Sequence, residues 1–115
     1  MNYKQKNEAH KEVKGLFKAN YPKGCIKMSN ETPEHFNVKS MVAFKYYKNG
    51  WEVYSEAVLK NGHRPDLVVV SGSVAMIVEI LATETEEKFL HKLGKYPLPI
   101  RKVYVKDFKY EDFCI

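Results

Sequence analysis

Two apolar runs, at residues 66–70 and 74–81, constrain the fold of this chain more than any other segment. Both runs are apolar on both alternating faces and are separated by the turn residues 71–73, which predicts two neighbouring strands covered by helices on each side. Each run also carries one carboxylate, Asp66 at the start of the first and Glu79 near the end of the second. A carboxylate in an apolar segment costs several kcal/mol unless a positive group meets it. Because a hairpin would bring the two acids together, the pattern suggests a shared cation.

The surrounding segments predict an α/β domain with a mixed β-sheet in the order ααβββαβ. Thr32 followed by Pro33 is a typical helix start, and Asn61-Gly62 is a strong signal for a hairpin turn. The expected elements are helices over 5–19, from 33 to 49–50 and from 83 or 85 to 94, and strands over 51–59, 66–70, 74–81 and 100–105.

The length of 115 residues allows one hydrophobic core. We expect a single domain, with a basic N-terminal helical extension over 1–30, a core over 31–105 and a tail over 106–115. No apolar run approaches the ~20 residues of a membrane span, and the N-terminus lacks the apolar segment of a secretory signal. Cys25 and Cys114 form neither a disulfide framework nor a metal-ligand spacing. We therefore expect a cytoplasmic (intracellular) protein without a membrane partner or an organic cofactor.

The positive charge lies in the first quarter of the chain. The net charge is +5, and residues 1–30 alone hold seven lysines and two glutamates, so the remainder is neutral. Lys11, Lys14 and Lys18 share one face of the first predicted helix. The opposite face is apolar and consists of Ala9, Val13, Leu16 and Phe17. A basic element on a neutral body suits a polyanion such as nucleic acid, and a solvated lysine-rich face explains the charge equally well.

Strand alternation and antiparallel pairing place Asp66 and Glu79 together at one rim of the predicted sheet. Glu56, in the preceding strand, reaches the same rim if that strand pairs alongside. Three carboxylates at one rim are hard oxygen ligands suited to Mg²⁺ or Mn²⁺. The simpler interpretations are a turn aspartate after a proline and a strand-end glutamate paired with a lysine.

This arrangement resembles the PD-(D/E)xK nuclease superfamily, which includes restriction endonucleases and Holliday-junction resolvases. The matching residues are Pro65-Asp66, a strand, a short turn, and Glu79 inside a second strand that precedes a helix. The helix with His35 and Lys39, followed by residues 50–56, is similar to the family's entry helix and first strand. The resemblance covers residues 33–105. It implies a restriction-endonuclease-like mixed sheet flanked by helices, with Asp66 and Glu79 as metal ligands.

The resemblance further implies Glu56 as an additional acidic group, and Mg²⁺ or Mn²⁺ as the cofactor. The family's lysine, two residues after the glutamate, falls on Leu81. Lys39 is the preferred substitute, because its helix should pack against the same sheet. Lys60 and Lys88 are weaker candidates. Small nucleases of this fold often work as dimers, so a homodimer is a further expectation.

The leading hypothesis is therefore a Mg²⁺-dependent endonuclease that hydrolyses DNA, with Glu56, Asp66, Glu79 and Lys39 as the catalytic set. Its nucleic-acid contacts would be Lys11, Lys14, Lys18, His35 and Arg64. His35 is equally well explained as a half-buried helix histidine, and Arg64 as an ordinary residue of a hairpin tip. Two further hypotheses are a catalytically inactive nuclease-fold module that binds nucleic acid, which Leu81 motivates, and a structural subunit.

Overall fold

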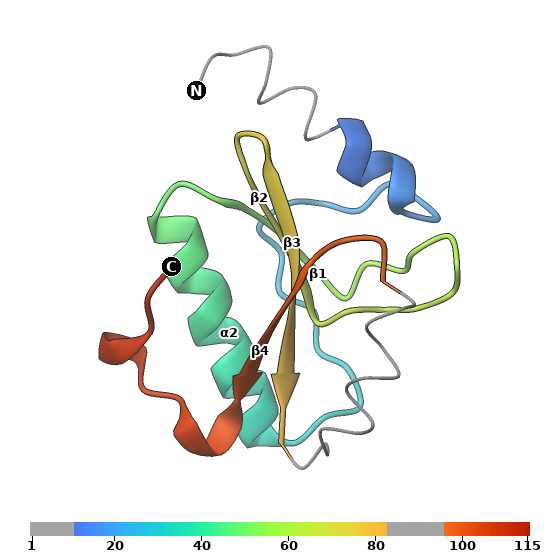
Figure 1. The fold of residues 1–115 in the computed structure, drawn as a ribbon. Helices are drawn as coiled ribbons and strands as arrows, with labels where there is room; N and C mark the ends of the chain where they lie inside the picture. The colour runs from blue at the N-terminus through green and yellow to red at the C-terminus, as the bar shows by residue number, and fades with distance from the viewer. Residues whose placement is uncertain (1–10, 83–95) are drawn as a thin grey trace.

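The computed structural model describes residues 11–82 and 96–115. Its centre is a four-stranded sheet with the strand order β1-β2-β3-β4 (Figure 1). The strands are β1 (Glu52–Ser55), β2 (Leu67–Ser71), β3 (Val74–Leu81) and β4 (Ile100–Tyr104). The first three strands pair antiparallel, whereas β4 runs parallel to β3. The predicted α/β class and mixed sheet are confirmed.

The helix α2 (Pro33–Lys48) covers one face of the sheet (Figure 1). The side chain of Thr32 accepts a hydrogen bond of 3.2 Å from the amide of His35, and the proline at the helix start has no amide to satisfy. Asn49 ends the helix, so both boundaries lie where the sequence predicted them. The buried face of α2 packs on apolar residues of all four strands; its members are Val38, Val42, Ala43 and Tyr46.

The N-terminal segment covers the opposite face of the sheet. Residues 11–16 are helical, and the start predicted at residue 5 lies outside the described residues. Val13 and Phe17 are buried against this face, and Lys11, Lys14 and Lys18 are exposed, as the amphipathic pattern predicted. The helix ends three residues before the predicted boundary. Phe17 forms a β-bridge with Leu59, which draws the backbone away from helical hydrogen bonding.

Strand β1 is shorter than predicted. It ends at Ser55 because Glu56 adopts a left-handed backbone conformation, with φ of 54°, that cannot continue a strand. The amide of Glu56 still bonds to the carbonyl of Asp66 at 3.1 Å, so the two chains separate only beyond this pair. Gly62 has a φ of 91° in the predicted turn. The helix expected to begin at Thr83 or Thr85 lies outside the described residues.

The C-terminal tail lies beside α2. It forms two short 3₁₀ turns, η1 (Val105–Asp107) and η2 (Tyr110–Asp112), and Phe108 and Phe113 pack against the core on the α2 side of the sheet. Across residues 11–82 and 96–115, no helix is both long and apolar enough to cross a membrane.

Candidate functional site

Asp66 and Glu79 lie together at the rim of the β2–β3 hairpin. Leu67 pairs with Val78 in the register, so the two acids are the next pair toward the rim. The amide of Asp66 donates a 3.1 Å hydrogen bond to Glu79 Oε2, and the amide of Ile80 donates one of 2.8 Å to Asp66 Oδ2. Antiparallel pairing therefore brings the two carboxyl groups into contact, as the hairpin predicted.

The carboxylates of Asp66 and Glu79 repel each other when both are ionised. Burial and the neighbouring Asp66 raise the pKa of Glu79 to about 7. Burial acts to raise the pKa of Asp66 as well, but hydrogen bonds from His35, Glu79 and the Ile80 amide hold it below its usual value. The hydroxyl of Tyr96 donates a 2.8 Å hydrogen bond to Glu79 Oε1. The pair is thus easiest to maintain with one negative charge, or with two charges and a cation.

His35 is the basic side chain that faces Asp66. Its Nε2 donates to the carbonyl of Ile80 at 2.9 Å and lies 3.5 Å from Asp66 Oδ2. Its Nδ1 lies 3.2 Å from Glu31 Oε2. The hydrogen bond with Asp66 raises the pKa of His35, although burial opposes this effect. The Asp66 carboxylate and the Ile80 carbonyl therefore both face Nε2 of the His35 imidazole.

Lys39 is fully buried, at 0% exposure, and lies with a different set of acids. Its ammonium donates to the carbonyl of Lys27 at 2.8 Å and to Glu31 Oε2 at 3.0 Å, and it lies 3.9 Å from Glu56 Oε2. Glu31 also accepts a 2.6 Å hydrogen bond from Ser29. Burial acts to raise the pKa of Glu31, but Ser29 and Lys39 lower it overall. Lys39 thus compensates Glu31 and Glu56 inside the protein.

Glu56 lies at the rim, but its carboxylate faces the basic side chains of Lys39 and Arg64. Oε1 lies 3.5 Å from Nε of Arg64, which is more than half exposed, and Oε2 faces the ammonium of Lys39. Burial raises the pKa of Glu56, with Lys39 acting in the opposite direction. The sequence-based prediction of Glu56 as a third metal ligand stays a prediction.

A pocket of about 320 Å³ joins these groups at the N-terminal end of α2. Its ionisable lining residues are Glu31, His35, Glu56, Arg64 and Asp66. Four of these five were candidate residues from the sequence. Glu31 was missed because it precedes the helix; its spacing of four residues from His35 and eight from Lys39 was the available signal.

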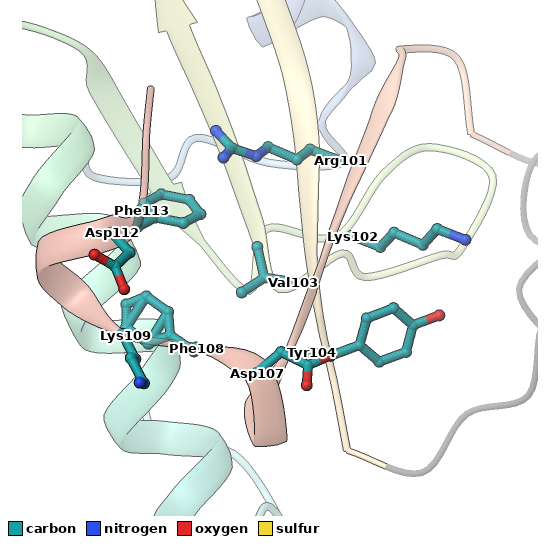
Figure 2. Close-up of a pocket in the computed structure, with 9 residues that line it drawn as sticks. All are labelled: Arg101, Lys102, Val103, Tyr104, Asp107, Phe108, Lys109, Asp112 and Phe113. Atoms are coloured by element: carbon teal, nitrogen blue, oxygen red, sulfur yellow. The ribbon is translucent and has the colours of Figure 1, made fainter.

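Position 81, where the resemblance expects a lysine, is a buried leucine paired with Tyr104. The neighbouring strand supplies a different lysine, because Lys102 of β4 is the register partner of Glu79. Figure 2 shows the Lys102 and Tyr104 side chains pointing away from α2, whereas Arg101 points toward it. Register partners in a parallel pair share a face, so Lys102 lies on the face that carries Glu79. Sequence reasoning missed Lys102 because strand register cannot be read from one strand alone.

The remaining predicted basic residues are exposed lysines or lie outside the described residues. Lys11 and Lys14 are exposed on the N-terminal helix and Lys18 is exposed just after it, in the segment that covers the sheet face opposite α2. Lys60 is exposed in the turn after Leu59, and Lys88 lies outside the described residues.

The carboxylate oxygens of Asp66 and Glu79 are suitable ligands for a hard divalent cation. Asp66 and Glu79 offer carboxylate oxygens in mutual contact, which a cation would relieve of their repulsion. Among residues 11–82 and 96–115, no three His, Cys, Asp or Glu side chains are grouped as a metal site. A cation at this rim would therefore rely on the acid pair and water, which is common for Mg²⁺.

Comparison with protein-family models and with curated proteins gives no match for this chain.

Proposed function

We propose that the protein is a metal-dependent nuclease that hydrolyses DNA phosphodiester bonds. The observation that carries this proposal is the contact between Asp66 and Glu79 at the rim of the β2–β3 hairpin. A buried and a partly buried carboxyl group in contact are difficult to keep ionised together without a cation. Their position beside a pocket that also holds Arg64 supports a site where a phosphate meets a metal.

Asp66 and Glu79 would hold Mg²⁺ or Mn²⁺. When bound, such an ion makes water a better nucleophile and neutralises charge on the phosphate. His35 positions the site, because it fixes both the Ile80 carbonyl and the Asp66 carboxylate from the first turn of α2. Arg64, exposed at the pocket, would bind the phosphate, and Glu56 beside it is a proton acceptor whose raised pKa favours that role.

Lys39 supports this chemistry indirectly in the proposal. Its buried ammonium holds Glu56 and Glu31 in place, and Lys102 becomes the candidate for the positive charge that position 81 lacks. The exposed lysines of the N-terminal helix would bind backbone phosphates without reading base sequence.

The test uses the full chain with plasmid, branched and single-stranded DNA in Mg²⁺ or Mn²⁺. Asp66→Asn and Glu79→Gln should each abolish cleavage and weaken Mn²⁺ binding measured by calorimetry. Asp107→Asn, at an exposed acid in η1, is the matched control and should cleave like the wild type. Cleavage that persists in both acid-pair variants would disprove the proposal.

A second candidate is a nuclease-fold module that binds nucleic acid without cutting it. The buried Leu81 favours it, because no lysine follows Glu79 on its own strand. This candidate predicts salt-sensitive DNA binding that EDTA leaves unchanged. Specific Mn²⁺ binding that depends on Asp66 would count against it, and failure to bind any nucleic acid at low salt would favour a structural subunit.

A further inference from the structure

The outer face of α2 carries large apolar side chains that the fold does not bury. Phe44 is 52% exposed and Tyr47 is 64% exposed, and Met41, one turn before Phe44, is 39% exposed. Large apolar side chains gathered on one surface mark interaction sites more often than isolated ones do. This face is far along α2 from the pocket that holds Asp66, which adjoins the first turn of the helix.

Phe44 and Tyr47 flank a hollow of about 480 Å³ between α2 and the loop at residues 23–26. Ala43 and Val53, both buried, and Ile26 contribute apolar lining. The loop is held against β1 by a 2.8 Å hydrogen bond from the amide of Gly24 to the carbonyl of Val53. The loop side of the hollow is therefore tied to β1, and Phe44 and Tyr47 are the partly exposed aromatic residues of its lining.

Two lysines and one glutamate lie at or beside this hollow, so its charge is positive by one. Lys23 lines it, and the ammonium of Lys48 lies 5.7 Å from the ring centroid of Phe44. The nearby carboxylate of Glu52 is compensated by Lys23 at 3.6 Å. Aromatic rings next to lysines are the combination that holds an unpaired nucleic-acid base together with its phosphate backbone.

A second copy of the chain is a poorer occupant. A two-fold interface would place the same patch on both partners, so the exposed Lys48 of each copy would add positive charge to the shared surface without adding an acid to meet it. A paired duplex is also a poor occupant, because its bases are stacked inside the helix and present no free ring face.

We propose that the Phe44–Tyr47 hollow binds an unpaired base of single-stranded nucleic acid. Stacking on the two rings holds the base, and Lys48 beside Phe44 attracts the adjoining phosphate. This binding site is separate from the acid pair and does not require catalysis, so it holds whether or not the protein cleaves DNA.

The test measures fluorescence anisotropy of a labelled oligodeoxythymidine with the full chain, in EDTA so that no cleavage contributes. Phe44→Ala and Tyr47→Ala should each weaken binding about five- to a hundredfold, the range that loss of one stacked base gives. Met41→Ala is the matched control, because it is exposed on the same helix but does not line the hollow. It should bind like the wild type.

An abasic oligonucleotide of equal length separates stacking from charge. The wild type should prefer the base-bearing strand, and Phe44→Ala and Tyr47→Ala should lose that preference while still binding the abasic strand. Equal affinities for wild type and both variants would overturn the proposal. A dimer in sedimentation that Phe44→Ala dissociates would also overturn it, because the hollow would then be occupied by a second copy. Thermal melting by circular dichroism checks that each variant is folded.

Discussion

The backbone amide of Asp66 donates a 3.1 Å hydrogen bond to the carboxylate of Glu79, so the main chain of one acid holds the side chain of the other. This contact follows from the β2–β3 register and does not require a ligand. It keeps the buried Glu79 and the partly buried Asp66 together despite the repulsion between their carboxylates. Stability should therefore respond to the charge on Glu79.

The folding stability should fall as pH rises toward 7 in EDTA. The pKa of Glu79 is raised from 4.5 to about 7 in the folded protein, so between these values the folded state retains a proton that the unfolded state has released. The free energy of unfolding therefore decreases by on the order of 3 kcal/mol as pH rises through this interval. Urea unfolding from pH 5 to 8.5 measures it.

Glu79→Gln isolates this effect, because glutamine keeps the hydrogen-bonding shape without the charge. The advantage of the variant over wild type should grow as pH rises and level off above about 7. Mg²⁺ should reduce that advantage by stabilising the wild type. A difference between the two proteins that does not vary with pH would contradict the prediction.

Removing the ammonium of Lys39 should destabilise the protein strongly. Lys39→Met leaves Glu31 and Glu56 in the interior without their shared cation, and such losses cost about 3–5 kcal/mol. Adding Glu31→Gln should recover part of the loss, because one uncompensated charge is removed. Lys48→Met, at the exposed end of the same helix, should change the free energy of unfolding by less than about 0.5 kcal/mol.

The left-handed backbone of Glu56 predicts an unusual order of substitutions. Glycine adopts φ of 54° without strain, so Glu56→Gly should be about 1 kcal/mol more stable than Glu56→Ala, although both lose the carboxylate. Glu52, in strand β1, is the matched position, and there alanine should be the more stable replacement. Urea unfolding of the four variants decides it; equal stability of the two Glu56 variants would argue against backbone strain.

Local signals in the sequence predicted most of the described fold. Thr32-Pro33 marked the start of α2, because a capping hydroxyl and a proline both act within one turn. Residues 74–81 marked β3 without error, since the apolar run has a turn at one end. The end of β1 was not predictable, because glutamate has no local preference for a positive φ and the residues that Glu56 contacts, Asp66 and Arg64, lie farther along the chain.

In the candidate site, too, the sequence predicted the local contacts and not the long-range ones. The contact between Asp66 and Glu79 follows from a hairpin, which is a local structure. The partners of Lys39 depend on how the loop before α2 packs, and the sequence offered no pattern for the segment at residues 25–30. Placing Lys102 beside Glu79 requires the parallel register of β3 and β4, which no local pattern in either strand encodes.

Lys102 should contribute to cleavage without contributing to metal binding, if the protein is a nuclease. It lies beside Glu79 in the register and shares its face of the sheet, so its charge would act near the acid pair. Lys102→Gln should lower the cleavage rate on the order of a hundredfold. Lys102→Arg should restore part of that rate, because it keeps the charge.

The control for this prediction is Lys109→Gln, at an exposed lysine of the C-terminal tail, which should cleave at the wild-type rate. Mn²⁺ affinity by calorimetry should be the same in Lys102→Gln and wild type, because the carboxylates of Asp66 and Glu79 are unchanged. Equal cleavage by wild type and Lys102→Gln would remove Lys102 from the site and leave His35 as the basic group nearest Asp66. A loss of Mn²⁺ binding would instead show that Lys102 acts on the acid pair itself.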